Sequence, residues 1–156
     1  MRFTSRHWAY FASFLFVALT LGPSLAHLFE LPNKISLERE AYFTVQAIYR
    51  GWSLLGIVIF GALLSTLTLS ILLRQEGLPI FGAVIAFLCL AAAQAIFWTW
   101  TYPANIATEN WTHVPANWEA LRRQWEYSHA AGACLNLVAM LALVFSVLTW
   151  RAKNHP

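Results

Sequence analysis

Two histidine–glutamate pairs carry the clearest chemical pattern in the sequence. His27-Leu-Phe-Glu30 and Glu126-Tyr-Ser-His129 each separate an imidazole from a carboxylate by three positions. Side chains three positions apart lie on one face of an α-helix, so each pair presents its two groups together. Imidazoles and carboxylates bind transition metals and also serve as general acids and bases. The spacing therefore predicts that these four residues are catalytic or bind a metal.

These four residues have three interpretations. As metal ligands, two imidazoles with one or two carboxylates suit a single iron, copper or zinc ion. A di-iron site would be incomplete, because the other apolar segments supply no carboxylate at a matching position. As acid–base groups, the imidazoles act directly on an organic ligand. In the third interpretation the carboxylates only form salt bridges, such as Glu126 with Arg122 and Glu30 with Lys34.

Tryptophans gather within or close to residues 33–50 and 103–126, the two long connections between apolar stretches, which adjoin these pairs. Six of the eight lie there, and only Trp8 and Trp150 lie elsewhere. An interfacial belt would explain part of this excess, but a belt populates both membrane faces. Aromatic side chains also suit a pocket for a flat hydrophobic molecule. The residues predicted to bind such a ligand are Arg50, Trp52, Trp98, Asn105, Trp118 and Trp125.

The composition places these residues in a membrane. The 156 residues are 59% hydrophobic and 11% charged, and the mean hydropathy is +0.56. Soluble domains are about 45–50% apolar and about 25% charged, and a chain of this size has too little interior to bury the excess. The net charge of +3 is spread along the chain. These numbers exclude a soluble enzyme, a disordered chain and a nucleic-acid-binding module, and they make the lipid bilayer an expected partner.

Four uncharged stretches are each long enough to cross the hydrocarbon core as a helix, which takes about 20 residues. We expect an all-α, single-domain integral membrane protein over residues 1–156, a four-helix bundle with up-down-up-down topology. The predicted spans are residues 8–28, 51–73, 79–102 and 127–150. Pro32 and Pro103 are expected to stop the first and third spans, because proline cannot continue a helix.

The two long connections are expected to form interfacial helices. Within residues 33–50, apolar side chains recur at helical spacing after two glutamates, as in an amphipathic helix. Residues 103–126 begin irregularly, and Asn117 then fits the N-cap of a helix that continues into the fourth span. The third connection, between the second and third spans, is a short hairpin.

This topology brings the polar residues to one membrane face. The end of the first span and the start of the fourth lie at the same end of an up-down bundle, where the two helices can be neighbours. His27 and His129 each lie about one turn inside their spans, so we expect them to face each other across one pocket. Glu30 and Glu126 are expected on its aqueous side. Ionisable residues at membrane depth are costly and therefore indicate function.

Basic residues give a predicted orientation. The tails and the short hairpin hold their cations in short segments, whereas the long connections mix theirs with most of the acids. Cytoplasmic segments are enriched in Lys and Arg, so we expect both termini in the cytoplasm. The expected location is the bacterial inner membrane, with the paired residues near the non-cytoplasmic face.

Four segments, in this order along the chain, resemble the small four-helix membrane proteins grouped with the anthrone oxygenases. They are AHLFELPNK at 26–34, IYRGW at 48–52, FWTWTYPAN at 97–105 and NWEALRRQWEYSH at 117–129. The resemblance implies an oxygenase-like redox role on an aromatic substrate, performed at the polar end of the bundle.

The residues and the resemblance together predict a membrane-embedded, oxygenase-like redox enzyme. Its expected substrate is a hydrophobic aromatic small molecule, held in a His/Glu/Trp-lined pocket near the non-cytoplasmic face. A second class of function stays open: a non-catalytic binding module or subunit whose tryptophan-rich face holds a partner or a lipid-like ligand. Assembly as a homo-oligomer stays open as well.

Cysteine labelling in sealed vesicles tests the topology. In a chain whose native Cys89 and Cys134 are replaced by alanine, Lys153→Cys and Glu109→Cys should react with a membrane-impermeant maleimide from opposite sides. The reason is that one fewer span precedes residue 109 than precedes residue 153. Labelling of both positions from the same side would contradict the four-span topology.

Overall fold

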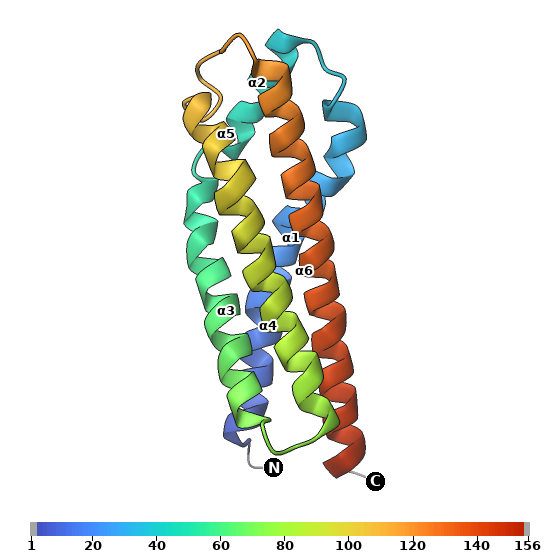
Figure 1. Ribbon diagram of the computed structural model, residues 1–156. Helices are drawn as coiled ribbons and strands as arrows, with labels where there is room; N and C mark the ends of the chain where they lie inside the picture. Colours follow the sequence, from blue (N-terminus) through green and yellow to red (C-terminus); the bar gives the residue numbers. More distant parts are fainter. Residues whose placement is uncertain (1–2, 155–156) are drawn as a thin grey trace.

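The computed structural model describes residues 3–154 and contains helices and no strands in that range. Four helices are long and apolar enough to cross a membrane, and they run up and down side by side (Figure 1). They are α1 (Ser5–Lys34), α3 (Leu55–Leu72), α4 (Leu78–Ile96) and α6 (Trp118–Asn154). The predicted all-α membrane bundle is confirmed.

Short helical elements cover one end of the bundle, and we call this group the cap. The cap consists of α2 (Arg39–Gln46), the 3-10 turns η1 (Ala47–Tyr49) and η2 (Trp52–Leu54), the π-helical turn η3 (Phe97–Thr101) and α5 (Tyr102–Ala107). It lies at the top of Figure 1, and the chain ends lie at the bottom. Gly51 makes the bend between η1 and η2 at φ 87°, a conformation that glycine adopts without strain.

The four long helices form a closed ring. α1 packs against α3 and α6, and α4 likewise packs against α3 and α6. α4 and α6 come very close where Gly82 lies against the backbone oxygen of Ala142 and against Ser146. Large side chains such as Phe60 and Leu141 point outward, as suits helices surrounded by lipid. The predicted contact between the first and last helices is therefore present.

A polar clamp holds the uncapped end of the ring together. Glu76, in the hairpin between α3 and α4, lies 2.7 Å from a guanidinium nitrogen of Arg6 and 2.8 Å from Nζ of Lys153. The hydrogen bond from Lys153 and the nearby Arg6 charge lower the pKa of the Glu76 carboxyl. The clamp ties both tails to one hairpin, so both chain ends lie at the same end of the bundle (Figure 1).

The expectation that Pro32 and Pro103 end helices is wrong. α1 continues past Pro32 to Lys34, whose ammonium group is buried and paired. Pro103 lies in the first turn of α5, where its missing N–H needs no helical partner. The wide π-helical turn η3 carries the chain from α4 directly into α5, so the third span runs on to Ala107.

The last span is also longer than predicted. α6 begins at Trp118. Arg122 and Glu126 do not mark a membrane boundary, because both are buried among partners in the cap. The backbone oxygen of Asn117 accepts the N–H of Leu121 at 3.2 Å, in agreement with a helix start at this point. In the first long connection the amphipathic helix is shorter than expected, from Arg39 to Gln46.

The contact between α4 and α6 predicts opposite effects for two Gly→Ala variants. A Cβ at position 82 would clash with the backbone of α6, whereas a Cβ at Gly22 meets nothing within 4 Å. Gly82→Ala should lower the free energy of unfolding by about 1–3 kcal/mol. Gly22→Ala should leave it unchanged or raise it by up to about 1 kcal/mol. Denaturant unfolding in detergent micelles measures both, and equal effects would contradict the close contact.

Candidate functional site

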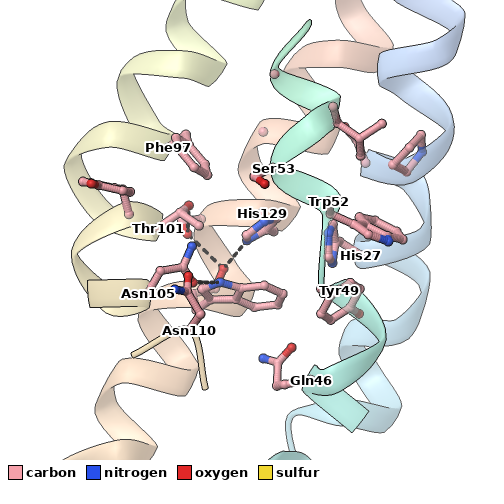
Figure 2. A pocket seen from close by; sticks show the side chains of 18 of the residues that line it. His27, Gln46, Tyr49, Trp52, Ser53, Phe97, Thr101, Asn105, Asn110 and His129 are labelled. Carbon is pink, nitrogen blue, oxygen red and sulfur yellow. Dashed lines mark hydrogen bonds between the residues drawn. The ribbon is translucent and has the colours of Figure 1, made fainter. Parts of the chain in front are cut away.

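A cavity of about 940 Å³ lies under the cap, among all four long helices. Its walls come from the second half of α1, from the end of α2 with η1 and η2, from the first turns of α3, from the end of α4 with η3 and α5, and from the first half of α6. Figure 2 shows His27, Trp52 and Tyr49 on one wall, Thr101 and Asn105 on the opposite wall, and His129 between them. The cavity combines aromatic surface with a few polar groups, as small-molecule sites do.

His27 and His129 lie side by side in the wall of this cavity. Their ring centroids are 4.2 Å apart, although one ring comes from α1 and the other from α6. Both rings pack against the indole of Trp125, at 5.1 Å and 4.0 Å between centroids. Tyr49 and Trp52 cover the remaining face of His27. The prediction that the two histidines face one pocket is confirmed.

Hydrogen bonding decides which nitrogen of His129 can accept a proton. Its Nδ1 lies 3.0 Å from the backbone oxygen of Trp125. A carbonyl oxygen only accepts, so Nδ1 carries the proton of the neutral ring and the lone pair stays on Nε2. Nδ1 of His27 is buried without a hydrogen-bond partner. The pair therefore presents an available proton acceptor next to a second imidazole.

Asn105 holds two indole rings of the cavity wall in place. Its Oδ1 accepts hydrogen bonds from Nε1 of Trp125 at 2.8 Å and from Nε1 of Trp111 at 3.2 Å. Asn105 therefore fixes the angle of the indole that supports both histidines. The π-helical turn η3 brings further cavity-lining side chains to the same wall, and π-turns occur often at functional sites.

A strained turn follows α5 at the rim of the cavity. Glu109, Asn110 and Trp111 all have positive φ values, of 50°, 56° and 65°. Such conformations are uncommon for residues other than glycine and cost energy, most of all for a bulky side chain. The turn positions all three residues in the cavity lining, and it delivers the Trp111 indole to Asn105.

Lys34 is the centre of a buried ionic network beside the cavity. Its Nζ lies 3.1 Å from Oε1 of Glu126, 3.4 Å from Oε2 of Glu30 and 2.7 Å from the hydroxyl of Tyr49. The ammonium also lies over the rings of Tyr49 and Trp125, at 4.5 Å and 4.7 Å. Only 3% of Lys34 is exposed. The network uses both glutamates of the predicted site for pairing with Lys34.

Two tyrosines of the cap complete this network. The hydroxyl of Tyr42 donates to Oε1 of Glu126 at 2.9 Å, and the hydroxyl of Tyr49 donates to Glu30. Burial, followed by the charge of Glu126, raises the pKa of Tyr42. Burial and the hydrogen bond to Glu30 raise the pKa of Tyr49 in the same direction. Both phenols therefore keep their protons and act as donors.

The structure places most of the predicted site residues in the cavity lining and the others outside it. The cavity lining includes both histidines together with Arg50, Trp52, Trp98, Asn105 and Trp125. Three predicted residues lie outside it. Trp118 packs instead under the guanidinium of Arg122, at 4.7 Å. Glu30 and Glu126 point into the network around Lys34.

The described residues do not form the predicted metal site. They contain no group of three or more His, Cys, Asp or Glu side chains placed to hold a metal ion. The physical reason is that a buried cation, Lys34, competes for both carboxylates. Both glutamates form salt bridges, as one interpretation predicted, and Lys34 is the expected partner of Glu30. The expected partner of Glu126, Arg122, is wrong, because Glu126 also pairs with Lys34.

Sequence reasoning missed several residues of this region. Lys34 was expected only as a salt-bridge partner of Glu30, because the two residues lie four positions apart. Tyr42 and Tyr49 belong to the apolar positions that recur at helical spacing within residues 33–50, and that pattern predicted no polar role for their hydroxyl groups. Asn136, a polar residue within an apolar stretch, was expected only to form an interhelical hydrogen bond, and it does so with Ser24 of α1. Nothing in the sequence pattern pointed to Gln46, which lines the cavity together with Asn136.

The buried ion pair predicts a non-additive pair of variants. Lys34→Met and Glu126→Met should each lower the free energy of unfolding by about 3–5 kcal/mol, because each leaves an unpaired buried charge. The double variant should recover much of this loss, since neither charge remains. Denaturant unfolding of the three proteins in detergent measures the coupling. Additive losses would show that the two side chains act independently.

A comparison of the chain with models of known protein families, with curated proteins and with solved structures finds no match.

Proposed function

We propose that this protein is a membrane-embedded enzyme that binds a hydrophobic aromatic small molecule in the cavity under the cap. The observation that carries the proposal is the imidazole pair, with ring centroids 4.2 Å apart in the wall of that cavity. The two imidazoles come from α1 and α6, which are far apart in sequence. They are well suited to taking up and releasing a proton at a bound ligand.

The cavity suits a hydrophobic aromatic molecule in size and in surface. Its volume of about 940 Å³ is at the upper end of the roughly 300–1,000 Å³ typical of small-molecule sites. Indole and phenol rings form much of its wall, and aromatic rings prefer to pack edge-to-face or offset against other rings. A molecule dissolved in the bilayer reaches a cavity among membrane-spanning helices without crossing water.

The imidazole pair supports an acid–base step on the ligand. Nε2 of His129 has its lone pair free because Nδ1 donates to the Trp125 carbonyl. Loss of a proton makes an aromatic ring more electron-rich, and dioxygen oxidises electron-rich rings most readily. An oxygenase-like reaction, with dioxygen as the oxidant and His129 as the base, is therefore the activity we propose. The resemblance to anthrone oxygenases points in the same direction.

The proposed setting is the bacterial inner membrane, with both termini in the cytoplasm and the cap on the opposite side. The concentration of cations in the tails and in the hairpin supports this orientation.

A second candidate function rests on the outer surface of η3. Trp98, which also lines the cavity, is 59% exposed, and Trp100, which does not line it, is 50% exposed, although tryptophan is usually well covered. A non-catalytic module could use these indoles to hold a partner or a lipid-like ligand. In that case the histidines would matter less than the two tryptophans.

Oxygen uptake by the protein in liposomes, with added hydrophobic phenols as substrates, distinguishes the two candidates. His27→Ala and His129→Ala should each lower turnover by roughly 100-fold or more, because a general base contributes at least that much. His113→Ala is the matched control, since His113 is exposed and lies outside the cavity lining. Thermal unfolding verifies that each variant is folded.

Unchanged turnover in both histidine variants would contradict the proposed enzyme. Loss of aromatic binding in Trp100→Ala, at a position outside the cavity lining, with both histidine variants unaffected, would favour the binding module.

A further inference from the structure

Two amide oxygens on cavity-lining residues are buried and have no hydrogen-bond partner. They are Oε1 of Gln46, which is 3% exposed, and Oδ1 of Asn136, which is 6% exposed. A buried acceptor left without a donor loses its hydrogen bonds to water and gains nothing in return. Native proteins contain few such groups, and each calls for a physical explanation.

The orientation of the Gln46 amide follows from the network around Lys34. Tyr42 has a single hydroxyl proton, which it donates to the ion-paired carboxylate of Glu126 at 2.9 Å. The oxygen of Tyr42 can therefore only accept from Gln46, whose Nε2 lies 2.5 Å away. The amide turns its NH₂ group toward Tyr42, and the carbonyl oxygen is left over. Figure 2 shows Gln46 reaching toward the space between Tyr49 and Asn110.

The orientation of the Asn136 amide follows from a similar chain of donors. The hydroxyl of Ser24 donates to the backbone oxygen of Thr20 at 2.9 Å, which uses its only proton. Its oxygen then accepts from Nδ2 of Asn136 at 2.8 Å. The reversed amide would break this two-bond chain, because Ser24 has no second proton to give. Oδ1 of Asn136 is therefore also left as a bare acceptor.

The two acceptors lie at different depths on either side of the histidines. Gln46 is bound, through Tyr42, to Glu126 near the start of α6, and Asn136 lies further along the same helix. With a rise of 1.5 Å per residue, positions 126 and 136 are about 15 Å apart along the helix axis. His129 lies between them. Both residues line the cavity, so a ligand bound next to the imidazole pair has one of these amides toward each of its ends.

We propose that Gln46 and Asn136 are specificity-determining residues that select ligands with a hydrogen-bond donor at both ends, such as hydroxyl or amino groups. The same ring system with only carbonyl or ether oxygens at its ends would place acceptor against acceptor and be rejected. This proposal rests on the proposed function, because it concerns the aromatic ligand of the same cavity. It predicts a polarity preference that ring shape alone would not produce.

Two probes of equal ring structure test the preference. 4,4′-Dihydroxybiphenyl carries a donor at each end, and 4,4′-dimethoxybiphenyl carries only acceptors. Binding is measured by quenching of tryptophan fluorescence in nanodiscs, with protein-free nanodiscs to subtract partitioning into lipid. The wild-type protein should bind the dihydroxy probe at least tenfold more tightly.

Three variants test whether the Gln46 and Asn136 amides cause this preference. Gln46→Leu and Asn136→Leu should each reduce the preference by roughly tenfold, because each removes one acceptor that the dihydroxy probe satisfies. Ser24→Ala retains Asn136 but frees its amide to reverse, so the preference should fall while the fold is kept. Gln124→Leu is the matched control, since Gln124 lies outside the cavity lining and its amide binds the backbone of Trp100.

The outcomes separate this inference from the proposed function. Equal binding of the two probes by the wild type, or a preference unchanged in Ser24→Ala and in the folded leucine variants, would overturn the inference and leave aromatic binding intact. Failure of the wild type to bind either probe would contradict the proposed function itself, and the inference with it.

Discussion

The capped end of this protein depends on one buried ion pair, between Lys34 at the end of α1 and Glu126 near the start of α6. Nζ and Oε1 are 3.1 Å apart, and both side chains are almost completely buried. An unpaired charge in such a place would cost several kcal/mol, roughly 3–5 when one partner is removed. The pair therefore fixes the depth of α1 relative to α6, and with it the alignment of His27 and His129.

The same ion pair also attaches the cap. Tyr42 of α2 and Tyr49 of η1 hydrogen-bond to the carboxylates that Lys34 neutralises. The cap elements are short and would be marginal helices in isolation. Their aromatic side chains pack against Trp111 and Trp125, so polar and apolar contacts hold the cap over the cavity together. The Gln46 amide takes its orientation from its hydrogen bond to Tyr42, and Gln46 lines the cavity. The network therefore extends to the cavity wall.

The two ends of the helix ring are packed by different kinds of side chain, and the cavity lies at the capped end. At the uncapped end small residues such as Gly82, Ala86 and Ala139 allow the helices to come into direct contact. At the capped end the cavity is lined by indole and phenol rings and by side chains of η3. Such a space persists only where the surrounding side chains are fixed, and Asn105 fixes two of the indoles with one oxygen.

The sequence determined the fold class and the position of the histidines. Apolar length specifies membrane helices directly, because an unpaired backbone in lipid is too costly for any other structure. Helical rise then places His27 and His129 at one depth from opposite directions along the chain. Segment boundaries were predicted less well, because proline at the first turn of a helix and charges paired in the cap do not stop a helix.

Only the tertiary structure decided what the glutamates, the tyrosines and the cavity amides do. Glu30 and Glu126 have the spacing of ligands, yet both of them pair with the buried ammonium of Lys34. Asn136 takes its orientation from Ser24 of another helix, and Gln46 takes its orientation from Tyr42, whose single proton is directed to Glu126 of α6. Such partners follow from contacts between distant segments, for which hydrophobic periodicity gives no signal.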